Sequence, residues 1–479
     1  MKDDHRFSDH GGDWYSFREE FGSEPLDFSA NVSPLGLPES ARDAARRALC
    51  ESARYPDPFC RALRKAIAKE HRVPLEWIFC GNGAADIIYR IAYAARPRRA
   101  LLLAPCFAEY ERALRRAGAE VDFYFPDALS KGRNKKGSAS ELETAVVPDS
   151  PAMLAQGFRI TDVSVFLRHI HPDTDMIMLG EPNNPTGLCT DRMVLTQIAD
   201  FCEARGIRLV FDECFMDFAE DGEKRSWLHR WRLLREEGKA KLRDDLREEG
   251  KTKLRDDLQE EGKVRMRDDL QVEGEARLRD ETSADDIVEW REPIRYRNVC
   301  VLRAFTKFYG MAGLRLGWCA IPDREFLGEV ILAGPPWSVS CTAQAAGIAA
   351  LGDHAYQERL RVMVGRERPC LIKGLRRLGI FVLPGEANYL MFFVPGSLYR
   401  GKLNSRETDG AEHKLSGPLN LCDLLRPYGI MLRDLQSFYG LGPGWYRTAV
   451  RTEEENERFL AVLSEIFGPD SKRNQEERK

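Results

Sequence analysis

Residues 303–317 read RAFTKFYGMAGLRLG and follow an apolar run, Val299 to Leu302, that is typical of a buried strand. Within this stretch Lys307 comes directly after the hydroxyl residue Thr306 and eight residues before Arg315. A lysine in an apolar setting loses its proton readily and becomes a nucleophile, and an arginine fork suits a phosphate group. The stretch therefore predicts a strand end that carries a reactive lysine. The pattern leaves open an ordinary loop whose lysine faces solvent.

Four other segments follow or end apolar runs in a similar way. Gly81 to Asp86 reads GNGAAD and opens a helical pattern, and glycines at a helix start free backbone N–H groups for a phosphate. Ala104 to Tyr110 and Glu181 to Gly187 each follow a strand-like run, and Leu209 to Asp212 is an apolar strand that ends in a carboxylate. Ligands usually bind at the carboxyl ends of strands on an open parallel sheet, so the set predicts one site. Alone, each segment also fits an ordinary turn, cap or core element.

In their order along the chain, the five segments resemble the fold-type I aminotransferase family, which uses pyridoxal 5'-phosphate (PLP). The resemblance implies an α/β fold in which helices wrap a mainly parallel central sheet, with a smaller α+β domain. It implies that Lys307 forms a Schiff base with PLP and that Asp212 pairs with the pyridine nitrogen. The other implied cofactor contacts are Asn184 at the phenolic oxygen, Phe107 stacked on the ring, and Gly83, Ala84, Thr306 and Arg315 at the phosphate.

Within this family the chain resembles the branch of histidinol-phosphate aminotransferases and threonine-phosphate decarboxylases, and local features favour the decarboxylases. Residues 26–36 read LDFSANVSPLG and residues 54–58 read RYPDP, similar to the decarboxylase opening. Residues 306–309 read TKFY, whereas the aminotransferases usually have Ser-Lys followed by a small residue. Phe215 stands where the aminotransferases normally have a tyrosine, whose hydroxyl bonds the phenolic oxygen of PLP.

The resemblance to the decarboxylases implies a reaction and a set of substrate contacts. The reaction converts L-threonine O-3-phosphate to (R)-1-amino-2-propanol O-2-phosphate and carbon dioxide for cobalamin biosynthesis. Arg447 would bind the substrate carboxylate and Arg433 its phosphate, since guanidinium forks suit both anions. His10 and Asn31 would border the substrate, and Tyr55 would reach in from the second subunit of a homodimer.

Two other interpretations stay open from the sequence. A histidinol-phosphate aminotransferase would need a 2-oxo acid acceptor, and a non-catalytic scaffold would bind PLP without turnover. Two residues also depart from the family pattern. Ala304 stands where relatives usually carry serine or threonine, which predicts one hydroxyl contact fewer to the cofactor phosphate. Glu181 stands where relatives usually carry a small or neutral residue.

The composition fits a large enzyme. At 479 residues, 43% of them hydrophobic, the chain can build two domains with substantial cores. A net charge of −4 predicts no nucleic-acid partner, and the polar start of the chain predicts neither signal peptide nor membrane anchor, which favours the cytoplasm. The twelve cysteines are scattered singly without a Cys-x-x-Cys pair, so we expect reduced core residues and no metal site.

The pattern predicts an amino-terminal arm that contributes to the small domain, a large PLP-binding domain and a small carboxyl-terminal domain, at residues 1–48, 49–322 and 323–479. A charged insert at about residues 231–286 contains four twelve-residue units. Such a period turns a helix by about 120° per unit, so its leucines form no single stripe, and we expect a solvated, partly helical or disordered excursion. Further polar surface segments are expected at residues 130–156, 399–418 and 468–479.

The repeats generate a first prediction. Deleting Arg235 to Thr282 should leave cofactor absorbance and turnover within about twofold of the full chain, because surface excursions contribute little to a folded core. Absorbance spectra and steady-state rates check this. Collapse of the truncated chain would show that the repeats support the fold.

Overall fold

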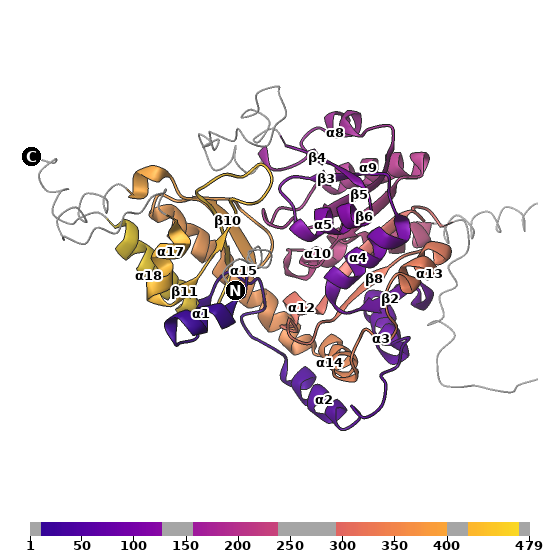
Figure 1. Cartoon of the computed structure of the whole chain (residues 1–479), viewed down its shortest axis with the longest axis horizontal. Coiled ribbons are helices and arrows are strands. Elements are labelled where there is room, and N and C mark those ends of the chain that lie inside the picture. The colour runs from indigo at the N-terminus through magenta and orange to yellow at the C-terminus, as the bar shows by residue number, and fades with distance from the viewer. Residues whose placement is uncertain (1–10, 127–156, 238–293, 400–419, 469–479) are drawn as a thin grey trace, which may run out of the picture.

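The computed structural model describes residues 11–126, 157–237, 294–399 and 420–468, and its main element is a seven-stranded sheet in the order β2-β8-β7-β6-β5-β3-β4 (Figure 1). Neighbouring strands run parallel except that β8 is antiparallel to both β2 and β7. The mainly parallel α/β sheet expected from the sequence is confirmed. The strands are β2 (Ile78–Gly81), β3 (Arg99–Leu103), β4 (Glu120–Tyr124), β5 (Thr174–Gly180), β6 (Arg208–Asp212), β7 (Val299–Ala304) and β8 (Gly317–Ala320).

Both faces of this sheet are apolar because helices cover both. Successive residues of a strand point to opposite faces, so Met176 and Met178 pack into one hydrophobic cluster while Ile177 and Leu179 pack into the other. The first cluster includes side chains of α4 (Gly83–Ala95), α5 (Ala108–Arg116) and α13 (Arg324–Leu332). The second includes side chains of α3 (Arg61–His71), α8 (Val163–His169), α9 (Arg192–Arg205) and α12 (Phe305–Phe308).

A smaller α+β unit lies beside the large sheet (Figure 1). Its four-stranded sheet has the order β12-β13-β10-β9, and a second pair joins β1 to β11. The strands are β1 (Leu26–Asp27), β9 (Phe381–Val382), β10 (Tyr389–Phe393), β11 (Ile430–Met431), β12 (Arg433–Asp434) and β13 (Trp445–Ala449). Its helices are α1 (Trp14–Phe21), α15 (His354–Arg377), α17 (Leu421–Leu425) and α18 (Glu453–Phe467).

The boundary between the two units is our proposal. Helix α13 packs against α4, and α14 (Cys341–Leu351) packs against α2 (Glu39–Leu49) and α3. Both helices therefore extend the large domain, and we propose that the division falls after α14 and not at residue 323. No helix among the described residues is long and apolar enough to cross a membrane.

The start of the charged insert needs a correction. Residues 227–237, which follow the short α10 (Gly222–Arg225), are helical, and Trp231 is only 1% exposed. Its ring packs edge-on against that of Trp77, with 5.3 Å between the centroids. Burying a large aromatic side chain stabilises by about 3 kcal/mol, which outweighs the polar residues around it. The start expected near residue 231 is therefore too early. The repeats from residue 238 onward, and nearly all of the other expected polar segments, lie outside the described residues.

Candidate active site

A cavity of about 150 Å³ opens where β5, β6 and β7 end and where α4 begins. It gathers residues that are far apart in the sequence because parallel strands end at the same edge of a sheet. Seven of the eight predicted cofactor residues line it, and Gly83 adjoins it through Arg315. The lining residues are Ala84, Ala85, Phe107, Tyr110, Pro182, Asn184, Asp212, Cys214, Phe215, Ala304, Thr306, Lys307, Ala312 and Arg315.

Lys307 lies on α12, which starts directly after β7. Burial, and then the nearby positive charge of Arg447, lower the pKa of Lys307 to about 8. The Nζ atom lies 5.9 Å from the ring centroid of Phe215, another residue of the lining. A lysine with this pKa is partly neutral near physiological pH, so its amine is ready to attack a carbonyl carbon.

Asp212 ends β6 and is held by two donors that the sequence did not suggest. Its Oδ2 accepts a hydrogen bond of 2.6 Å from the Tyr110 hydroxyl, and its Oδ1 accepts one of 3.0 Å from the backbone N–H of Cys214. Burial, and then the charge of Asp212, raise the pKa of Tyr110 well above its usual value, so the hydroxyl remains a donor. The signal that could have indicated this contact is the place of Tyr110 in the first turn of α5, three residues after Phe107, whose ring packs edge-on against that of Tyr110.

At the predicted phosphate end of the site, the backbone at the start of α4 lies close to the guanidinium of Arg315 and to Gly317. Gly83 has φ +82, and a Cβ placed there would lie 2.6 Å from Nη2 of Arg315. A Cβ on Gly317 would lie 2.6 Å from the backbone nitrogen of Ala84. Both positions favour glycine, and the free N–H groups at the start of α4 would suit an anion. Ala304 lines the cavity without a hydroxyl, whereas Thr306 supplies one.

These groups fit PLP in chemical kind. The helix start and Arg315 suit its phosphate, the Asp212 carboxylate suits a protonated pyridine nitrogen, and the amine of Lys307 suits its aldehyde. All three parts border one cavity. The role of each residue stays a prediction.

Arg447 lies on β13 and joins the cavity wall to the amino-terminal segment. Its Nη1 donates to Oδ1 of Asn184 at 2.6 Å, and its Nη2 donates to the carbonyl of Ser29 at 3.0 Å. Within the described part of the chain its buried Nε has no partner. Arg433 faces Arg447 directly across the β12–β13 pair. Burial and then Arg433 lower the pKa of Arg447 to about 10, so the Arg447 side chain stays cationic near neutral pH.

Of the other predicted substrate residues, Asn31 is buried and Tyr55 is exposed. Asn31 is 2% exposed, and its Oδ1 has no partner among the described residues. Tyr55 is 84% exposed and lies outside the cavity of its own chain, where its ring contacts Trp337 with 5.1 Å between centroids. His10 lies outside the described residues.

Glu181, which departs from the family pattern, is buried and precedes Pro182 of the cavity lining. Its carboxylate accepts hydrogen bonds from the backbone N–H of Thr190 at 2.8 Å and from the Thr190 hydroxyl. Burial raises the pKa of Glu181 to about 7, although both bonds from Thr190 oppose the shift. The side chain thus joins the first residue after β5 to the end of the loop that leads into α9.

The fold, together with Lys307, Asp212 and the glycine turn at the start of α4, is typical of a PLP-dependent class of enzyme. The chain matches the model of aminotransferase class I and II over residues 23–242 and 281–463. It belongs to the aminotransferase class I and II family, and its cofactor is PLP.

Individual relatives fall in both branches suggested by the sequence. Threonine-phosphate decarboxylase of Salmonella typhimurium is 30% identical, covering 96% of this chain and 97% of that protein. Histidinol-phosphate aminotransferase 1 of Cupriavidus pinatubonensis is 25% identical, covering 93% and 89%. The crystal structure of the histidinol-phosphate aminotransferase from Clostridium acetobutylicum shares the fold, with a TM-score of 0.63 at 21% identity over 92% of this chain and 98% of that one.

The lowered pKa of Lys307 predicts how the apoprotein takes up PLP. Only the neutral amine attacks the aldehyde, so the rate of covalent uptake should rise with pH and level off above about pH 8. Visible absorbance during reconstitution measures this rate, and Lys307→Ala should show no covalent uptake. A rate that keeps rising toward the ordinary lysine pKa of 10.5 would contradict the assignment.

The raised pKa of Glu181 predicts a pH-dependent cost to stability. Between pH 4.5 and about 7 the folded chain keeps this proton while the unfolded chain loses it, so the contribution of Glu181 to stability falls as pH rises through that window. Glu181→Gln should therefore raise the free energy of unfolding more at about pH 8 than at about pH 4.5, by about 3 kcal/mol at most.

Glu455 supplies a control of opposite sign. Burial raises its pKa, but hydrogen bonds from Arg451 and Thr452 outweigh this, and the pKa of Glu455 is lowered. Glu455→Gln should thus destabilise the chain more at neutral than at acidic pH. Denaturant unfolding at about pH 8 and pH 4.5 measures Glu181→Gln. For Glu455→Gln the acidic measurement lies below pH 4.5, because its contribution is lost only as pH falls from the unfolded value of 4.5 through the lowered folded value. Equal changes for Glu181→Gln at the two pH values would refute the expected titration.

Proposed function

We propose that this enzyme decarboxylates L-threonine O-3-phosphate to (R)-1-amino-2-propanol O-2-phosphate and carbon dioxide, a step of cobalamin biosynthesis. The observation that carries the proposal is the pair of buried arginines, Arg433 at 8% and Arg447 at 7% exposure, opposed across β12 and β13. Two neighbouring buried cations repel each other, so the pair favours a substrate with two anionic groups. A phosphorylated amino acid has both. The greater similarity to a threonine-phosphate decarboxylase supports the same choice.

The residues of the chain divide the work in this proposal. When bound, PLP supplies an electron sink for whichever bond at the α-carbon stands perpendicular to its ring. Lys307 attaches the cofactor through Nζ and, with a pKa near 8, also carries a proton to the α-carbon after carbon dioxide leaves. Asp212, held by Tyr110, keeps the pyridine nitrogen protonated.

Arg447 decides the direction of the substrate carboxylate in the same proposal. Its Nη1 and Nη2 are already bonded to Asn184 and Ser29, so its remaining N–H groups, including the unpaired Nε, define where an incoming carboxylate binds. Arg433 then receives the phosphate. Fixing both ends of a short substrate fixes the torsion at the α-carbon, and this torsion selects decarboxylation.

A histidinol-phosphate aminotransferase is the second candidate, because the chain is also similar to one over most of its length. Phe215 argues against it, since the phenyl ring offers no hydroxyl to the phenolic oxygen of PLP. Under either function we propose a homodimer. The exposed Tyr55 and Trp337 lie outside the cavity of their own chain, which leaves Tyr55 free to reach the site of a neighbour.

The direct test is incubation of PLP-loaded protein with L-threonine O-3-phosphate without any 2-oxo acid. Sustained release of carbon dioxide and aminopropanol phosphate is the expected result. If nothing is released and histidinol phosphate converts the cofactor to pyridoxamine phosphate, the protein is the aminotransferase.

A variant tests the phosphate contact separately. Arg433→Gln should raise the KM for the phosphorylated substrate by about tenfold to a hundredfold, because a charged hydrogen bond to phosphate is lost. Arg324→Gln removes an exposed arginine of α13 and is the matched control. An unchanged KM in Arg433→Gln would refute the phosphate role.

A further inference from the structure

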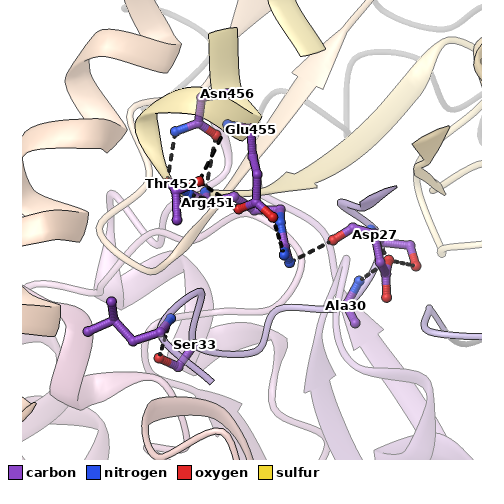
Figure 2. A network of polar contacts seen from close by, with 9 residues as sticks. Asp27, Ala30, Ser33, Arg451, Thr452, Glu455 and Asn456 are labelled. Carbon is purple, nitrogen blue, oxygen red and sulfur yellow. Dashed lines mark hydrogen bonds and ion pairs between the residues drawn. The ribbon is translucent and has the colours of Figure 1, made fainter. Parts of the chain in front are cut away.

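A short stretch of backbone, residues 27–33, connects the buried arginine pair to the reactive lysine. At its start, the N–H of Phe28 donates to Met431 at 2.9 Å and its carbonyl accepts from the N–H of Ala449 at 2.8 Å, which fixes it in the small domain. At its end, the N–H of Ser33 donates to the carbonyl of Lys307 at 2.9 Å. We call this stretch the 27–33 segment. Figure 2 shows Asp27, Ala30 and Ser33 along it.

The carboxylate of Asp27 shapes the turn in this segment. Its Oδ1 accepts from the backbone N–H and the hydroxyl of Ser29, at 2.7 and 2.6 Å, and from the N–H of Ala30 at 3.2 Å. The Ser29 hydroxyl accepts in turn from the N–H of Gly12 at 2.8 Å. Three donors on one oxygen define the local backbone path, so the direction of the Ser29 carbonyl depends on Asp27.

Arg451 holds the same turn from the other side. Its Nη1 donates to the carbonyl of Asp27 at 3.0 Å, and its Nη2 donates to Glu455 at 2.7 Å (Figure 2). Glu455 is itself fixed at the start of α18, where it accepts from both the N–H and the hydroxyl of Thr452. The Arg451 side chain thus connects the start of α18 to the backbone of Asp27.

This network of hydrogen bonds fixes the direction of the Arg447 guanidinium. The carbonyl of Ser29 is one of the two acceptors that orient its guanidinium, and Asn184 is the other. The negative charge of Asp27 also raises the pKa of Arg447, against the lowering by burial and by Arg433. Asp27 therefore supports Arg447 both by geometry and by charge, without lining the cavity itself.

We propose that Asp27 and Arg451 are positioning residues that set the angle of the substrate carboxylate through Ser29 and Arg447. Because the 27–33 segment also bonds to the Lys307 backbone, it fixes Arg447 relative to the lysine. This inference rests on the proposed function, in that Arg447 is taken to bind a carboxylate. The angle of that group at the α-carbon decides which bond breaks, so the network acts on reaction specificity.

Two ligands separate positioning from general structural damage. One is 3-(phosphonooxy)butanoate, which carries phosphate and carboxylate but no amine and so cannot react. The other is 1-amino-2-propanol O-2-phosphate, which lacks the carboxylate. In calorimetric titration of the PLP-loaded protein, Asp27→Ala should weaken the first about tenfold and the second by less than about twofold, because only the carboxylate contact depends on the turn.

Matched variants sharpen this test. Asp27→Asn keeps an oxygen that can accept the same three bonds, so it should recover most of the affinity. Asp162→Ala removes a similar aspartate turn, which accepts from Ser164 and Val165 at the start of α8, and should leave both affinities unchanged. Arg451→Lys serves where Asp27→Ala fails to hold PLP, because a lysine cannot bond Asp27 and Glu455 as a fork, and it should show the same selective loss. Equal weakening of both ligands, or none, overturns the proposal.

Reaction specificity gives an independent readout. In Asp27→Ala, a larger share of turnovers with L-threonine O-3-phosphate should end in pyridoxamine phosphate, as seen by absorbance, and a smaller share in carbon dioxide. If the wild type proves to be an aminotransferase, the proposed function fails, but the network can still be tested. Asp27→Ala should then weaken glutamate and spare histidinol phosphate, which has no carboxylate. An unchanged product ratio and unchanged glutamate affinity would overturn the positioning role.

Discussion

The site depends on the parallel pairing of β5, β6 and β7. Gly180 lies opposite Asp212, and Asp212 lies opposite Leu302, so β5 and β6 end at one level and β7 continues two residues further, to Ala304. The loops that leave these ends bring Asn184, Asp212 and Lys307 to one cavity. A slip of one residue in β6 would turn the Asp212 carboxylate to the other face of the sheet, away from Tyr110. The register of β5, β6 and β7 therefore determines whether the side chains that line the cavity meet at one place.

A buried ion cluster locks the ends of β6 and β7 beside this cavity. Arg303, at 3% exposure, lies 3.0 Å from Glu213 and 2.8 Å from Asp217. Arg303 and Glu213 are the sequence neighbours of Ala304 and Asp212, which line the cavity. Breaking a buried ion pair leaves an uncompensated charge and costs about 3–5 kcal/mol, whereas a well-packed apolar replacement need not destabilise. Such a cluster therefore contributes less to net stability than to holding two strand ends in a single arrangement.

The sequence predicted those parts of the site that can be recognised from neighbouring residues in the chain. Lys307, Asp212, Asn184 and the glycine turn each stand at the end of a strand or the start of a helix, where neighbouring residues reveal their place. It did not predict Tyr110 on Asp212 or Asp27 and Arg451 behind Arg447, because those contacts join residues 102 to 424 positions apart. It also misplaced the start of the charged insert, since the burial of Trp231 follows from its packing on Trp77 and not from its charged neighbours.

The distribution of these contacts bears on how one fold supports two reactions. Groups that bind an amine, a pyridine ring and a phosphate serve transamination and decarboxylation equally, so they carry no information about which bond breaks. In the function we propose, that choice lies in the direction of the substrate carboxylate that Arg447 would bind. The direction of Arg447 itself is set by Asn184 after β5, by Ser29 in the amino-terminal segment and by its own strand β13. Three elements distant in sequence must therefore be placed correctly for the proposed torsion at the substrate α-carbon to be fixed. A change of reaction within the family can therefore arise from residues that never touch the substrate, and single motifs around the lysine are poor guides to it.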